Sequence, residues 1–322
     1  MRILIGTLYS GENEFPECVA AIERQSHSDW EHFVIRDMPN KEAHVALYET
    51  FMSRASEFDL FAKIDADMVL IDDDFLANVA EKFRTSEWLE FLCVTVHDFF
   101  TDTPVFGLHV YRNTTTWEET DEKVFVDIYP RDPESTVMDD SELAPAAMHC
   151  GNPSPFQAFH FGMHKGVKFL EGLRLDSDFA ILVHSGNIEQ TWQHFLRSGD
   201  KRLGLASLGA ELALRGDLQA EHLDYGDSYS RSVWEQHDNL DEKELRTLVR
   251  RLRRRNWGWV PRVPRRDIFR YGLVSASARQ CMRDLGLVFV ANSVRRFGRS
   301  VLPWSVRQRI RGLLGLATYE SK

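Results

Sequence analysis

Short apolar runs alternate with helical periods through the first hundred residues, and this alternation constrains the fold more than any other feature. The apolar runs are typical of strands and cover residues 2–7, 32–37, 60–64 and 91–96. Between them, apolar residues recur at helical spacing over residues 15–25, 43–54 and 74–83. Such alternation predicts parallel βαβ units with right-handed crossovers. We therefore expect an α/β fold with a mostly parallel, twisted sheet flanked by helices.

The pattern is less regular after Phe100. Residues 105–111 and 124–129 are typical of strands, and residues 191–213 are mainly helical in pattern. Residues 241–255 predict a charged helix.

Polar side chains gather where the predicted strands end. In parallel sheets, ligands bind outside the carboxyl ends of the strands. The residues expected at those ends are polar, and four of them are acidic: Thr7, Tyr9, Asp37, Asp65, Asp67 and Asp98. The sequence therefore predicts a ligand site at this edge of the sheet.

The triplet Asp65-Ala66-Asp67 is the most informative of these ends. In an extended segment, residues i and i+2 point to the same side, so the two carboxylates can act together. Hard oxygen ligands of this kind suit Mg²⁺ or Mn²⁺, with phosphate oxygens and water completing the shell. The alternative is that the triplet only caps the following turn. Its place after the third strand of a βαβαβ unit favours the metal site.

The segments Ile3–Tyr9, Phe33–Asp37 and Lys63–Asp67 resemble the opening of GT-A-fold glycosyltransferases, in particular those of family 2. The similarity covers residues 1–100 well and the next hundred more loosely. It implies a Rossmann-like GT-A catalytic domain that binds a sugar nucleotide. One departure is that Met38-Pro39-Asn40 stands where the family usually has a second acid and Gly-Ser.

The resemblance also implies roles for single residues. Thr7 and Tyr9 would line the base pocket, with Tyr9 stacked on the nucleobase, and Asp37 would accept a hydrogen bond from the base. Lys63 would lie near the phosphates, while Asp65 and Asp67 would contact the ribose and the metal.

A divalent cation suits such a reaction for a chemical reason. Transfer of a sugar from a nucleoside diphosphate expels a diphosphate, and Mn²⁺ or Mg²⁺ would stabilise the charge growing on it. We therefore expect a transferase that moves a sugar from a nucleoside-diphosphate sugar to an acceptor hydroxyl. A glycan or lipid-linked glycan is the acceptor that the resemblance implies.

A further metal ligand in the family is often a histidine on a later strand. His149 is the candidate, because it ends a small apolar run and begins a Gly/Asn/Pro loop. His160 and His164 are spaced to share one helix face, although Gly162 weakens a helix there. For each histidine, ordinary packing or surface exposure remains open.

An inverting transferase also needs a general base to deprotonate the acceptor hydroxyl. The Glu-Asp pair that family 2 has before its late histidine is missing here. Asp127 and Asp140, with Asp139 beside the latter, are the available candidates, and each is also typical of a surface carboxylate.

Charge is strongly segregated along the chain. From Arg246 onward there are 19 basic and 3 acidic residues, against 20 basic and 46 acidic residues before it. We expect a catalytic domain over residues 1–240 and a basic, mostly helical extension over residues 241–322. Residues 262–322 could contact an anionic membrane or pack on the acidic domain. Nucleic-acid binding is less favoured, because no recognised module accompanies the basic segment.

Features that the sequence lacks indicate where the protein is located and argue against one alternative function. The four cysteines are scattered and form no CxxC pair, and residues 1–10 do not resemble a signal peptide. We expect a cytoplasmic protein, at the inner face of the membrane if the basic extension binds lipid. A sugar-phosphate nucleotidyltransferase is disfavoured, because the loop after the first strand has few glycines and an acid, Glu12. A non-catalytic GT-A-like scaffold is the other alternative.

Overall fold

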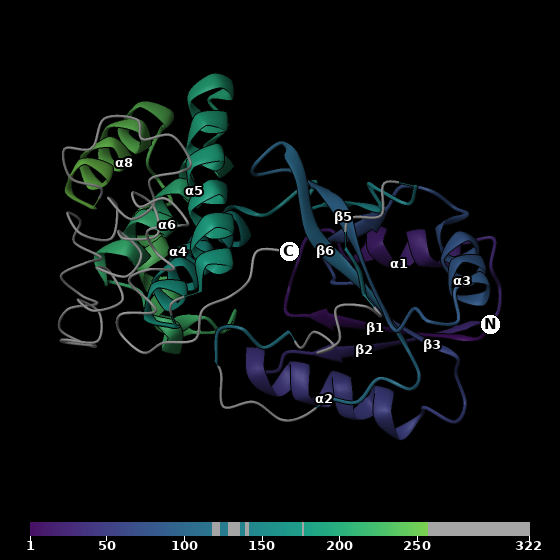
Figure 1. Ribbon diagram of the computed structural model, residues 1–322. Coiled ribbons are helices and arrows are strands. Elements are labelled where there is room, and N and C mark those ends of the chain that lie inside the picture. The colour runs from purple at the N-terminus through teal and green to yellow at the C-terminus, as the bar shows by residue number, and fades with distance from the viewer. Residues whose placement is uncertain (118–122, 128–135, 139–141, 176, 257–322) are drawn as a thin grey trace, which may run out of the picture.

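The computed structural model describes residues 1–117, 123–127, 136–138, 142–175 and 177–256 (Figure 1). Its strands are β1 (Ile3–Tyr9), β2 (Trp30–Arg36), β3 (Leu60–Lys63), β4 (Met68–Leu70), β5 (Phe91–Asp98), β6 (Thr103–Arg112), β7 (Thr136–Met138) and β8 (Ala147–His149). Its helices are α1 (Phe15–Glu23), α2 (Asn40–Ser53), α3 (Phe75–Thr85), α4 (Pro155–Leu175), α5 (Asp178–Ser198), α6 (Lys201–Arg215), the 3₁₀ turn η2 (Ala220–His222), α7 (Ser228–Glu235) and α8 (Glu242–Asn256).

The strands form one mixed sheet in the order β2-β1-β3-β6-β5-β8-β4, with β7 paired to β5. β1 pairs in parallel with β2 and β3, and β5 pairs in parallel with β8. β6 runs antiparallel between β3 and β5, because it returns from β5 through a short turn. The α/β class is confirmed, but the sheet is mixed, since a hairpin return reverses β6.

Both faces of the sheet are buried, as continuous apolar strands require. Along β1, Ile3 and Ile5 pack in the cluster that includes residues of α1 and α3, while Leu4 packs in the cluster that includes α2. Figure 1 shows α1 and α3 on one side of the sheet and α2 on the other. This packing fixes the direction in which the strand ends point.

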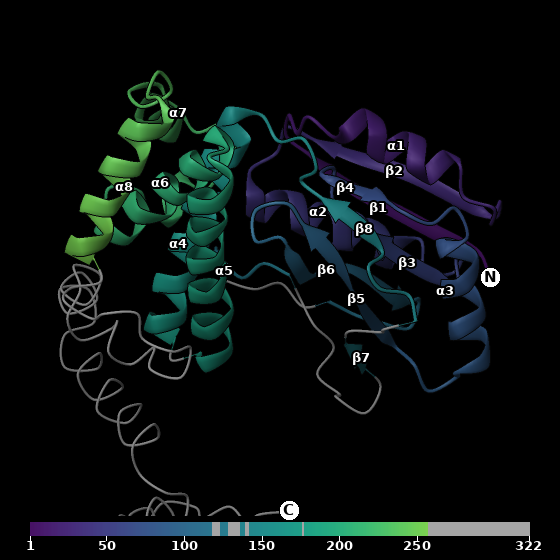
Figure 2. The same ribbon diagram turned by 90° about the horizontal axis from the view of Figure 1, so that it is seen from above.

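A second layer of helices stands beside the sheet (Figure 2). α4 and α6 pack so closely that a Cβ on Gly162 would lie 1.7 Å from the backbone oxygen of Ala206. Leu245, Val249 and Leu252 of α8 join the same apolar cluster. The charged helix expected at residues 241–255 is therefore confirmed, and it packs on the described helices. The boundary expected at residue 240 stays a prediction.

Several local expectations differ from the structure. The helical pattern over residues 191–213 is split into α5 and α6, because Gly199 ends α5 in a left-handed conformation (φ 71°) and Asp200 caps α6. Residues 123–127 form no strand, although a strand was expected over residues 124–129. The short strands β4 and β7 were not expected, whereas β8 ends at His149, which was the candidate for a ligand on a later strand.

Among the described helices, none is long and apolar enough to span a bilayer. The two alternatives for residues 262–322, contact with an anionic membrane or packing on the acidic domain, fall outside the described residues.

Candidate functional site

A cavity of about 1450 Å³ lies between the carboxyl ends of the strands and the helices α4 and α5. The sheet side contributes the β3–β4 connection and the end of β8, including Asp65, Asp67 and His149. The helical side contributes side chains such as Lys168 and His184. Of the six residues predicted at strand ends, Asp65 and Asp67 therefore lie at a large cavity.

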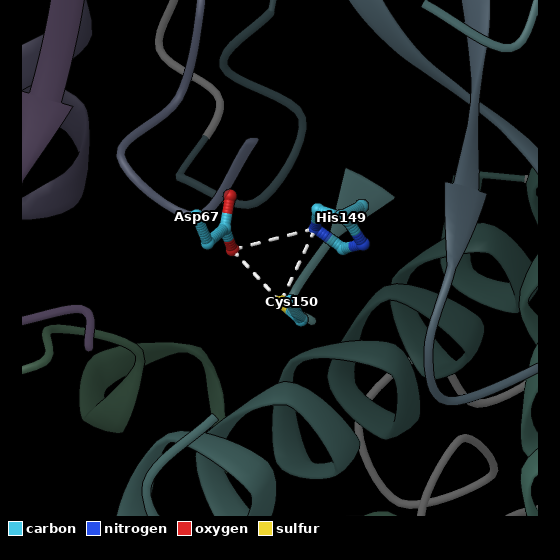
Figure 3. A group of neighbouring side chains, drawn as sticks. All are labelled: Asp67, His149 and Cys150. Carbon is cyan, nitrogen blue, oxygen red and sulfur yellow. Dashed lines mark hydrogen bonds and ion pairs between the residues drawn. The ribbon is translucent and has the colours of Figure 1, made fainter. Parts of the chain in front are cut away.

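Three potential metal ligands meet on the sheet side of this cavity (Figure 3). Nε2 of His149 lies 3.3 Å from Oδ2 of Asp67. The thiol of Cys150 donates to the same oxygen over 3.0 Å and lies 3.5 Å from Nε2 of His149. One ligand atom from each residue lies within 4.8 Å of the other two. We call Asp67, His149 and Cys150 the strand-end cluster.

Strand pairing builds the strand-end cluster from distant parts of the chain. β4 begins immediately after Asp67 and pairs with β8, with Met68 opposite His149. The backbone N–H of Cys150 donates to the carbonyl of Asp67 over 2.8 Å. The cluster therefore depends on one short antiparallel ladder.

A buried carboxylate fixes the orientation of His149. Nδ1 of His149 lies 2.7 Å from Oδ1 of Asp98, whose side chain is only 1% exposed. The backbone N–H and the hydroxyl of Thr101 donate to Oδ2 of Asp98, each over 2.7 Å. Carboxylates in this position orient metal-binding histidines and select their tautomer. Nε2 of His149 is thereby directed toward Asp67.

The strand-end cluster fits a divalent cation on two grounds. Oδ2 of Asp67 contacts His149 and Cys150, whereas its other oxygen, Oδ1, is buried and has no hydrogen-bond partner in the part of the chain described. Such an orphan oxygen is costly unless a cation or another donor satisfies it. The second ground is the donor set of carboxylate oxygen, imidazole nitrogen and thiol sulfur, all common metal ligands.

Burial and neighbouring charges together set the pKa values of the cluster residues. Burial opposes ionisation of Asp67, but the imidazole of His149 outweighs it and lowers the pKa of Asp67 to about 2. Burial would lower the pKa of His149, yet Cys150, Asp67 and Asp98 raise that pKa well above the usual value. Burial also raises the pKa of the Cys150 thiol. An ionised carboxylate is thus held ready in the cavity.

A second group of charges lies beside the strand-end cluster. Nζ of Lys63 lies 3.0 Å from Oδ2 of Asp65 and 3.1 Å from Oδ1 of Asp127. The side chain of Lys63 is only 4% exposed. Burial would lower the pKa of Lys63, but Asp127 and Asp65 raise it above its usual value. Lys63 is therefore a fixed cation.

Asp127 is not a surface carboxylate, one of the two interpretations that the sequence left open. His44 and Tyr48 approach its Oδ1 at 3.4 and 3.3 Å, in addition to Lys63. Burial opposes its ionisation, but Lys63 and His44 hold the pKa of Asp127 well below its usual value. Such a carboxylate is a weak proton acceptor. Asp139 and Asp140, the other candidate bases, lie outside the described residues.

The predicted nucleotide-binding residues divide into two groups. Lys63 and Asp65 line the cavity, whereas Thr7, Tyr9 and Asp37 do not. Thr7 is buried and donates to the carbonyl of Ile64 over 2.8 Å. The Tyr9 ring contacts Phe15, with centroids 4.3 Å apart, and carries Arg36 over it at 5.0 Å. The roles of these residues toward a nucleotide stay predictions.

Asp37 and the two other histidines also have clear positions. Asp37 follows β2 in a left-handed conformation (φ 52°), and its backbone N–H donates to the carbonyl of Tyr9. His160 and His164 share one face of α4, with ring centroids 6.2 Å apart, and line the cavity outside the strand-end cluster. Nε2 of His160 lies 2.9 Å from the carbonyl oxygen of Leu223.

Sequence reasoning missed two residues of the site. Cys150 follows His149 directly, so its proximity to the predicted ligand was the available signal. Glu12 lines the cavity, and burial together with the charge of Asp67 raises its pKa to about 7. Glu12 could have been recognised as an acidic residue in the loop after the first strand, where a base or a phosphate ligand is expected.

Comparisons with known proteins add little. No protein-family model matches the chain, and no curated protein is significantly similar to it. Among solved structures, that of A197 from STIV is similar at 20% sequence identity with a TM-score of 0.27. The match covers 35% of this chain and 65% of A197, so it spans less than two thirds of that protein. A similarity this weak carries no argument about function.

Proposed function

We propose that the chain is a metal-dependent glycosyltransferase of the GT-A type, which transfers a sugar from a nucleoside diphosphate to an acceptor hydroxyl. The observation that carries the proposal is the strand-end cluster, with the orphan oxygen of Asp67, at the wall of a large cavity. The resemblance of Ile3–Tyr9 and Lys63–Asp67 to family 2 openings supports the same reading.

Asp67, His149 and Cys150 are the residues that would hold the metal. A bound divalent cation supplies positive charge next to the diphosphate leaving group. The imidazole makes this donor set less suited to Mg²⁺, which takes oxygen ligands, than to Mn²⁺. Ionised Cys150 would favour Zn²⁺ or Fe²⁺ over both. Asp98 keeps Nε2 of His149 facing the metal position.

Lys63 would act on the donor through charge. Because Asp65 and Asp127 hold its ammonium group at 3.0 and 3.1 Å, Lys63 stays protonated and fixed in position. A preorganised cation of this kind stabilises developing negative charge without reorganisation during the reaction. Asp65 then orients Lys63 and remains a candidate contact for the ribose.

Glu12 is a better candidate for the general base than Asp127. A base works best when its pKa lies near the working pH, and the pKa of Glu12 is raised to about 7. Its Oε2 accepts a hydrogen bond from the backbone N–H of Ser10 over 2.7 Å, which fixes the carboxylate at the cavity. Glu12 would accept the proton of the acceptor hydroxyl as the sugar is transferred.

The direct test is turnover of the donor by the full-length protein. We would incubate it with sugar conjugates of UDP, GDP, dTDP and CDP, with Mn²⁺ or with EDTA, and quantify the nucleoside diphosphate released. We expect release from one nucleotide class, and only with the metal. Metal-dependent binding of a nucleotide without any release would favour the non-catalytic scaffold instead. Equal release in EDTA would refute the metal assignment.

A further inference from the structure

The helical wall of the cavity is basic where it faces the acidic sheet wall. Lys165 and Lys168 both line the cavity from α4. Residues three apart in a helix lie on one face, so their ammonium groups share the same side of α4. His184 lines the cavity from α5. We call Lys165, Lys168 and His184 the helical-wall cluster.

The two lysines have no anionic partner within the described part of the chain. Neither forms an ion pair or a side-chain hydrogen bond there, and Lys165 only approaches the ring of Phe161, at 4.7 Å. Asp65 and Asp127 pair directly with Lys63 and act on Lys168 only at longer range, where they raise its pKa. Within the described residues, the positive charge of the helical wall thus has no direct ion pair, and carboxylates act on it only at longer range.

His184 adds an unsatisfied nitrogen to the same wall. The residue is only 9% exposed, and its Nδ1 is buried without a hydrogen-bond partner in the described structure. The ring stacks on Phe125, with centroids 6.1 Å apart, which fixes its plane. A buried polar atom without a partner in a cavity wall indicates a ligand that satisfies it.

Burial and mutual repulsion lower the pKa values of these groups. Burial lowers the pKa of Lys168 to about 8, and the charge of Lys165 contributes, while Asp127 and Asp65 oppose the shift. Burial also lowers the pKa of His184 well below its usual value, and both lysines lower it further. Like charges held together without a counter-ion cost free energy, which a bound anion would recover.

We propose that Lys165, Lys168 and His184 form a binding site for a phosphoryl group on the helical wall of the cavity. Two ammonium groups and an imidazole match the charge and the several acceptor oxygens of a phosphoryl group. A single carboxylate would leave one lysine uncompensated. The source of the phosphoryl group rests on the proposed function: it belongs to the diphosphate of the donor or to a phosphorylated acceptor.

Inorganic pyrophosphate tests the site without any nucleotide. We would titrate it into the full-length protein in EDTA, so that metal at the strand-end cluster does not contribute, and measure the heat of binding. We expect binding by the wild type and at least tenfold weaker binding by the double variant Lys165→Met/Lys168→Met. The double variant Lys165→Arg/Lys168→Arg should retain binding. Lys243→Met, at an exposed lysine of α8 that does not line the cavity, is the control and should bind like the wild type.

Two outcomes would overturn the helical-wall site: no pyrophosphate binding by the wild type in EDTA, or equal affinity in the methionine double variant. Folding of each variant is checked by its thermal transition. Because removal of uncompensated cations relieves repulsion, the methionine variant should be at least as stable as the wild type. A less stable variant with weak binding would point to a structural role, unless the arginine variant restores binding.

Competition with a nucleoside diphosphate and Mn²⁺ identifies the source of the phosphoryl group. If it is the diphosphate of the donor, pyrophosphate displaces the nucleotide and the methionine variant binds the nucleotide more weakly. If it belongs to the acceptor, both bind together and the variant retains nucleotide affinity. Either result supports the site. Lysine-dependent pyrophosphate binding without any metal-dependent nucleotide binding would refute the proposed function and leave this site standing.

Discussion

The two walls of the cavity carry opposite charge and differ in how that charge is satisfied. On the sheet wall, Asp98 and Lys63 hold His149 and Asp65 in fixed positions through short contacts. On the helical wall, Lys165 and Lys168 have no anionic partner in the described structure. The sheet wall is therefore preorganised by the protein. The lysines of the helical wall have no direct ion pair in the described residues, and in our proposal a phosphoryl ligand supplies it. A substrate that carries both a metal and phosphates would satisfy the two walls together.

Asp67→Asn should have the largest effect, because it removes the anionic ligand of the strand-end cluster. We expect sugar transfer to fall about a thousandfold, in line with the several kcal/mol that metal-ion catalysis contributes. Steady-state kinetics at saturating Mn²⁺ would measure it. Asp102→Asn is the matched control, since Asp102 also lines the cavity but lies outside the cluster. Comparable losses in the two variants would show that the cluster has no special role.

Gly162→Ala should disrupt the packing that positions the helical wall. Its Cβ would lie 1.7 Å from the backbone oxygen of Ala206, so α4 and α6 must move apart. We expect a loss of about 3 kcal/mol in the free energy of unfolding, at the upper end for overpacked cores. Gly186→Ala on α5 is the control, because its Cβ meets nothing within 4 Å. The Gly186→Ala variant should gain about 0.5–1 kcal/mol in the free energy of unfolding from helix propensity. Urea denaturation would measure this free energy for both variants.

Glu12→Gln tests whether the sheet wall also supplies the general base. We expect kcat to fall about a hundredfold while metal affinity is unchanged, as for other removed bases. In the wild type the rate should rise with pH as Glu12 loses its proton. The midpoint should lie at or below the raised pKa of about 7, because a cation at Asp67 favours the ionised form. An unaltered pH profile in the variant would exclude Glu12 as the base.

Asp98→Asn should have a smaller effect, since Asp98 acts through His149 as a positioning residue. We expect metal affinity to fall about 10–100-fold, as when other carboxylate partners of metal-binding histidines are removed. Raising the Mn²⁺ concentration should restore kcat toward the wild-type value. A kcat that stays low at every metal concentration would assign Asp98 a different role. Thr101→Val, which leaves the bond from Asp98 to His149 in place, controls for lost packing.

Much of the sheet wall could be predicted from local sequence. Leu60, Phe61 and Ala62 are fully buried neighbours, so a continuous apolar run reveals their strand. Because Asp65 and Asp67 come shortly after that run, the sequence also predicted that they lie at the strand end. Of the predicted metal ligands, Asp67 and His149 lie together in the structure, at 3.3 Å, whereas Asp65 pairs with Lys63 outside the strand-end cluster.

The rest of the site depends on long-range contacts that local patterns do not reveal. β4 and β8 have three residues each, too few to show a period, yet their pairing brings Cys150 to Asp67. Gly162 was interpreted as a residue that weakens a helix, whereas it permits the close approach of α4 to α6. A lysine on α4 is no different in sequence from a surface lysine until the cavity is known.

Binding of nucleoside diphosphates tests the account most directly. We would record the thermal unfolding of the wild type and of Asp67→Asn with UDP, GDP, dTDP or CDP, each with Mn²⁺ and with EDTA. A ligand at a hundred times its dissociation constant stabilises the folded state by about 2.7 kcal/mol. The account predicts stabilisation of the wild type by one nucleotide class with Mn²⁺, and none in EDTA or in Asp67→Asn. Stabilisation that is equal in EDTA, or equal in Asp67→Asn, would contradict it.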